Sequence, residues 1–200
     1  MSAEALSTLL LSRRSLRRYA ERPVEDEVVR AIVEAARVAP SASNGQPCRW
    51  VAVRAPAARA ALAAACFSGI FAATRFAARA PLILALCADR RGALRAAHAI
   101  KDSAMYQLDC GIAGEHLVLR ATELGLGTCW IGWFNRRAAR RSLGVPRGVE
   151  VVSLIAAGYP PEGWAPPARP RLALPSILWA DRWGRGMPGD EGDGQVRTGG

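Results

Sequence analysis

The chain has 200 residues, of which 50% are hydrophobic and 22% are charged, and its formal net charge is +10. This balance is typical of a folded domain and excludes a mainly disordered chain. No apolar run reaches the ~20 residues of a membrane span, and the Leu9–Leu11 run is too short for a secretory signal. We therefore expect a soluble, cytoplasmic protein with no membrane partner. The positive charge favours acidic ligands such as phosphates, nucleotides or nucleic acid, or else reflects an arginine-rich solvated surface.

The cysteine pattern limits the kinds of site. Five cysteines are widely spaced without a C-x-x-C pair, and the chain has only two histidines. A zinc site and a disulfide framework are therefore unexpected, and we predict free thiols in a reducing compartment and no bound metal. Most of the cysteines should pack as small core hydrophobes.

Hydrophobic periodicity predicts helices and short strands in the first half of the chain. Pro23 opens a helix in which Val28, Ile32 and Val33 follow the 3.6-residue period. A continuous apolar run is typical of a strand buried on both faces. In chain order we predict helices over 3–11 and 25–38, a polar turn over 40–47, a strand over 50–53, a helix over 57–65, an ambiguous loop or helix over 67–76, and a buried strand over 81–88.

The second half begins with the longest helical pattern, 103–124, which ends at Gly125. Its stripe of Leu108, Ile112, Glu115 and Leu119 predicts one side that faces the core. Next we predict a strand over 127–131, a helix capped by Asn135 and ending near 144, and a strand over 149–157.

The composition changes after Tyr159, where seven prolines fall within 160–188. We predict an extended arm over 160–185, anchored by its tryptophans, and a disordered tail over 186–200. Residues 1–185 should form a single domain. Because helices and strands mix without strict alternation, the fold class is predicted to be α+β.

Three stretches carry candidate binding chemistry. Arg13-Arg14-Ser15-Leu16-Arg17 places three guanidinium groups and a hydroxyl within five residues, a set that matches phosphate oxygens. A solvated face or a nucleic-acid patch is the alternative. The turn over 40–47 offers hydroxyls and amides to a planar heterocycle, or is a plain turn built from turn-forming residues.

The third stretch, 123–134, is rich in glycine, so a ligand could approach its backbone closely. Its glycines follow a helix, so it is not the G-x-G-x-x-G of a strand–turn–helix unit, and a Rossmann dinucleotide site is disfavoured. Gly125 itself is expected to end the helix in a Schellman motif.

Four blocks of this sequence, in this order and spacing, resemble the nitroreductase family of FMN-dependent oxidoreductases. The family's opening phosphate-binding motif is similar to RRSLRRY, and its helix–loop–strand segment is similar to VVRAIVEAARVAPSASNGQPCRWVAV. Its late helix and flavin-edge loop are similar to LRATELGLGTCWIG, and its terminal basic motif to PPARPRLAL. The resemblance covers about residues 6–183.

The resemblance implies an α+β, nitroreductase-like fold with a central, mostly antiparallel sheet flanked by helices. It also implies a homodimer in which each C-terminal arm embraces the partner and two FMN sites lie at the subunit interface. NADH or NADPH would reduce FMN in a ping-pong reaction, and a small-molecule acceptor such as a nitroaromatic or quinone would take the electrons.

The resemblance also implies roles for particular residues, and it requires no acid or base from the protein because the chemistry is largely the flavin's own. Arg17 should lie beside the N1/O2 edge of the flavin, where its charge would stabilise the anionic reduced form. The other implied cofactor residues are Arg13, Arg14 and Ser15 for the phosphate and ribityl chain; Pro40, Ser41, Ser43, Asn44 and Gln46 for the isoalloxazine, from the partner subunit; Thr128, Cys129 and Trp130 along the ring; Gly132 and Trp133 at its central nitrogen; and Arg169 and Arg171 for the phosphate.

One departure from the family pattern and two alternatives stay open. Cys48 follows Gln46-Pro47 where the family often has an aromatic residue, so a thiol could lie near the site. The same fold could instead carry a flavin oxidase or dehydrogenase that desaturates a small molecule or a peptide-derived ring. A basic nucleic-acid-binding module would need a helix-turn-helix or an aromatic platform, and the sequence shows neither, so we expect no nucleic-acid partner.

Overall fold

The computed structural model describes residues 3–89, 91 and 105–189. The chain divides into two compact units, Met1–Trp164 and Ala165–Gly200, and each is described here by itself. Whether residues 1–185 act as one domain stays a prediction. The predicted tail over 186–200 lies mostly outside the described residues.

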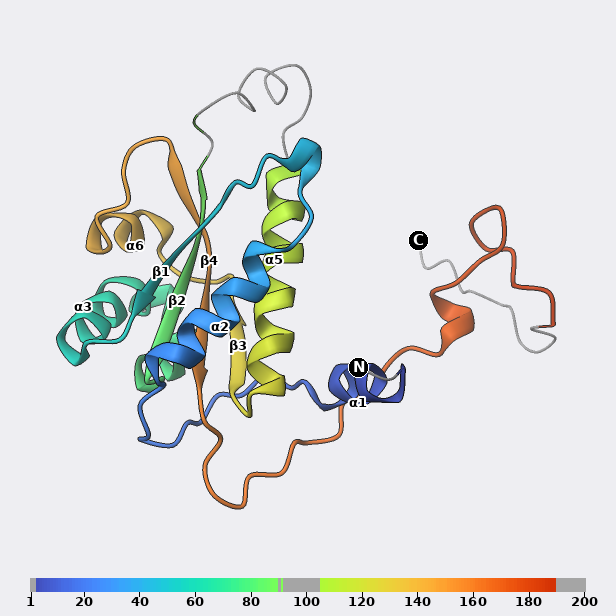
Figure 1. The fold of residues 1–200 in the computed structure, drawn as a ribbon, viewed down its shortest axis with the longest axis horizontal. Helices are drawn as coiled ribbons and strands as arrows, with labels where there is room; N and C mark the ends of the chain where they lie inside the picture. Colours follow the sequence, from blue (N-terminus) through green and yellow to red (C-terminus); the bar gives the residue numbers. More distant parts are fainter. Residues whose placement is uncertain (1–2, 90, 92–104, 190–200) are drawn as a thin grey trace. The chain divides into compact units, whose positions relative to one another are not determined.

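The first unit is built on a four-stranded sheet in which every neighbouring pair is antiparallel, as predicted (Figure 1). The strand order is β1-β2-β4-β3, so β1 and β3 form the two edges. The central strands read as continuous apolar runs because helices cover both of their faces. The strands are β1 (Cys48–Val53), β2 (Leu82–Asp89), β3 (Gly127–Ile131) and β4 (Val149–Gly158).

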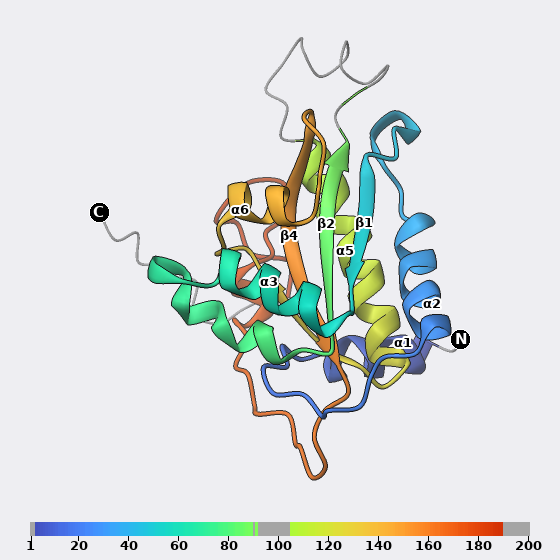
Figure 2. The same ribbon diagram turned by 90° about the vertical axis from the view of Figure 1, so that its left-hand side faces the viewer.

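Helices form a layer on each face of this sheet (Figures 1 and 2). One face packs against α2 (Asp26–Arg37) and α5 (Met105–Glu123), and the other packs against α3 (Pro56–Cys66) and α6 (Arg136–Ser142). The segment over 67–76, ambiguous in the sequence, is largely the 3-10 helix η2 (Gly69–Arg79), on the α3 side. A further helix, α1 (Ala3–Ser12), contacts α5, and the short 3-10 turn η1 (Ala42–Asn44) precedes β1. These elements confirm the α+β class.

The predicted helix ends follow from local capping. The Asn135 side chain accepts a hydrogen bond from the Ala138 amide at 3.0 Å, which starts α6. Gly125 takes a φ of +78° just after α5. The amide of Leu126 then donates to the Ala121 carbonyl at 2.8 Å, as in a Schellman motif. Both predicted caps are confirmed.

The predicted core face of α5 is wrong. Leu108 is 57% exposed, and Ile112 and Leu119 are only half-buried. The buried side of the helix instead carries mostly small residues: Tyr106, Asp109, Cys110, Ala113, Gly114, Leu117, Val118 and Ala121. Small side chains allow the helix to lie close to the sheet, and Leu108 is left exposed on the opposite side.

Gly114 is the point of closest approach between α5 and β3. A Cβ atom at Gly114 would lie 2.1 Å from Cη2 of the Trp130 indole. We therefore expect Gly114→Ala to destabilise the protein by about 1–3 kcal/mol, because a rigid ring would have to move in a packed core. Chemical denaturation checks this.

The matched control for Gly114→Ala is a double-mutant cycle with Trp130→Leu. A smaller side chain at 130 leaves room for the added methyl group, so the double variant should lose clearly less than the sum of the two single losses. Strict additivity would mean that the indole does not limit the space at Gly114.

The second unit has little regular structure among its described residues, 165–189. It contains the 3-10 turn η3 (Leu174–Ser176) and a turn in which Arg185 pairs with Asp181 at 3.2 Å. Trp179 and Trp183 stack with ring centroids 4.0 Å apart. The predicted embrace of a partner by this arm stays a prediction.

No helix among the residues that the structure describes is long and apolar enough to cross a membrane. Within the same ranges, no group of three or more His, Cys, Asp or Glu side chains is arranged to hold a metal ion.

Candidate active site

The arginine-rich segment that follows α1 lies beside the start of β3. Ser15 forms an isolated parallel bridge with Thr128, and the Leu16 amide donates to the Thr128 carbonyl at 2.8 Å. The Leu16 side chain is 1% exposed and sits on Gly127, where a Cβ atom would lie 2.2 Å from its Cδ2. The structure therefore brings together two of the predicted blocks, 13–17 and 128–133, that are more than a hundred residues apart in sequence.

Tyr19 stabilises the segment 13–17 through a hydrogen bond to its backbone. Its hydroxyl donates to the Leu16 carbonyl at 2.7 Å, and burial raises the pKa of the Tyr19 phenol well above its usual value. The phenol therefore stays neutral and keeps its proton as a hydrogen-bond donor. Arg17 lies on the exposed side of this chain segment, with its guanidinium 5.7 Å from the centre of the Phe76 ring.

The guanidinium groups of Arg13 and Arg14 differ in their partners. Arg13 Nε lies 3.9 Å from Glu115 Oε1 on α5. Arg14 turns back towards α1, where its Nη1 donates to the carbonyls of Leu11 and Arg13. Its Nε is buried and has no hydrogen-bond partner. A buried charged donor without an acceptor is costly, so an anionic acceptor at this atom would be stabilising.

The loop 40–46 is held in an unusual backbone conformation. Ser43, Asn44 and Gln46 have φ values of 49°, 53° and 46°, in the left-handed region that favours glycine. Hydrogen bonds inside the loop support it, since the Gln46 amide donates to Ser41 Oγ at 2.9 Å and Gln46 Nε2 donates to Asn44 Oδ1 at 3.1 Å. Hydrogen bonds within the loop therefore support its backbone conformation, and its role as a binding loop stays a prediction.

Asp109 of α5 anchors this loop. Its Oδ1 accepts a hydrogen bond from the Ala42 amide at 3.0 Å, its side chain is 4% exposed, and its Oδ2 has no partner. Sequence reasoning missed this residue. One feature of the sequence could have indicated it: Asp109 is a carboxylate on the same side of the helix as the small residues Cys110 and Ala113, which are buried.

The loop 40–46 and the segment 13–17 do not meet within one chain. They contact α5 at Asp109 and at Glu115, six positions apart, which is about 9 Å of helix rise and about 120° around the axis. Figures 1 and 2 show η1 at one end of α5 and α1 at the other. The two segments therefore contact α5 at different positions along its length.

Only part of the third block is open to a ligand. Thr128 and Cys129 are buried, and Trp130 packs its indole against Gly114, so these three side chains are used in the core. Gly132 is exposed, and no atom lies within 4 Å of the position of its missing Cβ. Trp133 is 57% exposed. The open part of the block is therefore the end of β3 and the two residues that follow it.

The η2 segment contacts this open end, although none of its residues is among the predicted cofactor-binding residues. The Trp133 indole Nε1 donates to the Ile70 carbonyl at 3.0 Å, and Thr74 Oγ1 donates to the Trp133 carbonyl at 3.1 Å. The Phe71 and Trp133 rings lie 5.4 Å apart at 54°. Together with Phe76 near Arg17, η2 forms one wall of the candidate site.

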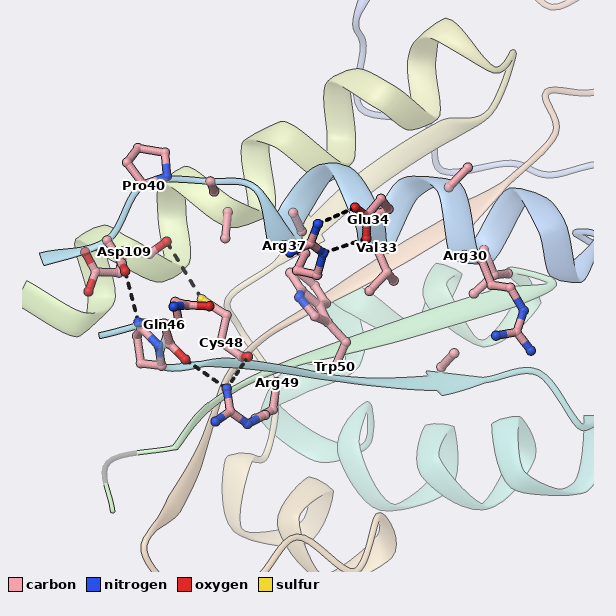
Figure 3. Close-up of a pocket in the computed structure, with 18 of the residues that line it drawn as sticks. Arg30, Val33, Glu34, Arg37, Pro40, Gln46, Cys48, Arg49, Trp50 and Asp109 are labelled. Atoms are coloured by element: carbon pink, nitrogen blue, oxygen red, sulfur yellow. Dashed lines mark hydrogen bonds and ion pairs between the residues drawn. The ribbon is translucent and has the colours of Figure 1, made fainter. Parts of the chain in front are cut away.

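A groove of about 990 Å³ runs between α2 and β1 (Figure 3). Pro40, Ser41 and Gln46 line one end of it, beside Cys48 and Asp109. Three of the predicted loop residues therefore face solvent-accessible space. The remaining predicted residues, Arg169 and Arg171, belong to the second unit and are exposed there, so their role at the phosphate stays a prediction.

Comparisons with known proteins identify the family and the fold of this chain. The nitroreductase family model matches residues 10–159. An NADH dehydrogenase of Thermus thermophilus is 34% identical over 86% of this chain and 94% of its own length, and an FMN reductase [NAD(P)H] of Bacillus subtilis is 30% identical over 84% and 70%. The crystal structure of a nitroreductase family protein from Clostridium novyi NT superposes with a TM-score of 0.68 at 26% identity, over 90% of this chain and 96% of that one.

The family match spans both blocks that the structure brings together, from the last residues of α1 to the residue after β4. The relatives and the solved structure share most of their length with this chain, so the likeness is not confined to one motif. This chain belongs to the nitroreductase family and is an NAD(P)H oxidoreductase.

Proposed function

We propose that this protein is an FMN-dependent oxidoreductase that passes electrons from NADH or NADPH to an oxidised small molecule, such as a nitroaromatic or a quinone, in a ping-pong reaction. The observation that carries the proposal is the arginine-rich segment 13–17, which is hydrogen-bonded to the start of β3, the strand that leads to the open backbone at Gly132. The similar FMN reductase [NAD(P)H] supports the cofactor and the donor. When bound, FMN supplies the capacity to accept a hydride and to release the electrons to an acceptor.

The residues present fit the phosphate of FMN. Arg13, Arg14 and Ser15 supply guanidinium and hydroxyl donors within three positions, and the buried Nε of Arg14 lacks an acceptor. A phosphate oxygen would satisfy such a donor in a charge-assisted hydrogen bond. In this assignment the segment holds the cofactor through its charge, while the pairing of Leu16 with Thr128 fixes its distance from β3.

Arg17 and Trp133 have different tasks in this proposal. Arg17 is exposed on the side of the segment that faces Phe76, and there it supplies a positive charge beside negative charge that forms on reduction. Trp133 and Phe71 give an aromatic wall that excludes water from one side of the site. The η2 segment would therefore shape the space in which the acceptor binds.

A homodimer completes the site in this proposal. The loop 40–46 lies at the other end of α5 from the segment 13–17, so it would reach the flavin held by the partner subunit. Leu108 of α5 is exposed, and the arm exposes Leu172 and Trp183 as well. Apolar surface of this kind favours burial against another chain.

The test is the identity and the reduction of the bound flavin. We expect a yellow protein that releases FMN on denaturation, identified by chromatography against FMN and FAD standards. Anaerobic addition of NADH or NADPH should bleach the flavin absorbance, and steady-state rates with a quinone acceptor should give parallel double-reciprocal lines.

Two outcomes would contradict the proposal in different ways. Release of FAD, or no flavin binding on reconstitution, would overturn the cofactor assignment. Bound FMN that neither NADH nor NADPH reduces, but that a saturated small molecule does, would favour the alternative of an oxidase or dehydrogenase acting on that molecule.

A further inference from the structure

Two cysteines outside the proposed chemistry lie side by side. Cys48 is the first residue of β1, Cys110 lies in α5, and their sulfur atoms are 3.6 Å apart. Both are free thiols. A disulfide needs a sulfur separation of about 2.05 Å, so the two sulfur atoms would have to approach by roughly 1.5 Å.

The two thiols differ in their access to solutes. Cys110 is fully buried, whereas Cys48 is half-buried and lines the groove between α2 and β1. Figure 3 shows the Cys48 sulfur directed from β1 towards α5 at Asp109, whose carbonyl oxygen lies 3.9 Å away. A small oxidant in the groove would therefore reach Cys48 first, with Cys110 directly behind it.

The surroundings also separate Cys48 from the other thiols. A hydrogen bond with Cys110 lowers the pKa of Cys48, and the same contact raises the pKa of Cys110. Burial raises the pKa of Cys66 and of Cys87 to about 11, and it raises the pKa of Cys129. Since the thiolate is the reactive form, oxidation should begin at Cys48.

We propose that Cys48 and Cys110 form a redox-active dithiol, which hydrogen peroxide converts to an intrachain disulfide and which a thiol reductant restores. The Cys48 thiolate attacks one peroxide oxygen, the O–O bond breaks, and hydroxide leaves, which gives a sulfenic acid on Cys48. The Cys110 sulfur then attacks the Cys48 sulfur, the S–O bond breaks, and the departing hydroxide takes the Cys110 proton as water. In total, two thiols and one peroxide give one disulfide and two water molecules.

The position of this dithiol links it to the loop 40–46. Cys48 follows Gln46 by two positions, and Cys110 follows Asp109, which accepts the hydrogen bond from Ala42. The disulfide would add a covalent bond to a junction at which that hydrogen bond and the contact of Cys48 Sγ with the Asp109 carbonyl already join the loop and β1 to α5. Formation of the disulfide does not depend on the proposed cofactor, so it can be tested separately from the proposed function.

The experiment treats the purified protein, as isolated, with hydrogen peroxide, blocks free thiols with iodoacetamide under denaturing conditions, and digests it with trypsin. Each cysteine falls in its own tryptic peptide, because arginine or lysine bounds each of 38–49, 60–75, 80–90, 102–120 and 121–136. We expect a linked pair of 38–49 with 102–120, two hydrogens lighter than the sum of the reduced peptides. The other three peptides should remain alkylated, and dithiothreitol added before blocking should abolish the link.

Two variants make the assignment specific. In Cys110→Ser the sulfenic acid has no partner, so dimedone should label peptide 38–49. In Cys48→Ser peptide 102–120 should stay alkylated under the same peroxide. Absence of the linked pair in the unsubstituted protein, equal oxidation of Cys66, Cys87 and Cys129, or a link that runs between two chains on a non-reducing gel would each overturn the proposal.

Discussion

Replacing Arg13 by alanine is expected to weaken FMN binding by about 1.5–3 kcal/mol, a rise in Kd of about 10- to 150-fold. The guanidinium of Arg13 stands at the start of the segment that lies beside β3, next to the unpartnered Nε of Arg14. Loss of a charge-assisted hydrogen bond to the phosphate accounts for an effect of this size. Arg171→Ala should have a similar effect, because the family resemblance assigns it to the same phosphate. Titration of the apoprotein variants with FMN measures both.

The matched controls are Arg137→Ala and Arg140→Ala on α6, which remove the same charge from a helix that we assign to a solvated surface. These variants should change the Kd for FMN far less than Arg13→Ala does. Equal losses at all four positions would mean that the positive charge acts only in a general way, and the phosphate assignment would be wrong.

Disrupting the exposed apolar surfaces is expected to give a monomer that has lost FMN. Leu108→Asp places a charge in the exposed stripe of α5, and a double change of Trp179 and Trp183 to serine removes the aromatic pair of the arm while leaving Arg169 and Arg171 in place. A buried, unpaired carboxylate in an apolar interface is strongly unfavourable, so association should fail. Light scattering measures the molecular mass, and flavin absorbance measures the amount of FMN bound per chain in the same sample.

Leu108→Met is the matched control for the α5 variant, because it keeps an apolar side chain of similar size and should leave both dimer and flavin unchanged. The proposed dimer site predicts that loss of the dimer and loss of bound FMN occur together. A stable monomer with one FMN per chain would contradict it, together with the assignment of the residues over 40–46 to a shared site.

Periodicity located the helices of this fold but did not identify which side of the longest one is buried. In α5 the larger apolar side chains, Leu108, Ile112 and Leu119, form the more obvious stripe, yet the core side is made largely of small residues around Gly114. Small residues contribute little to a hydrophobic pattern, although they permit close packing against Trp130. The burial of a helix face depends on its neighbours in space, which the pattern of one segment does not contain.

The site was predictable to a similar extent. The block 13–17 and the end of β3 were found by their residue types, and the structure brings them together. The anchor Asp109 and the wall formed by η2 were missed, because each acts through a contact to a residue far away in the sequence. Trp130 was expected along the flavin ring together with Thr128 and Cys129. Its side chain packs against α5, so its backbone is the part that remains for that role.

The wall made by η2 has an evolutionary consequence. Its eleven residues form 3-10 turns outside the sheet, and its links to Trp133 run through the Ile70 carbonyl, the Thr74 hydroxyl and one aromatic contact. The segment 13–17, by contrast, is tied to the sheet itself. In the proposed assignment, substitutions in η2 would therefore leave the support of the segment 13–17 in place. A change of acceptor preference would then need substitutions in one short segment only, while the rest of the fold stays the same.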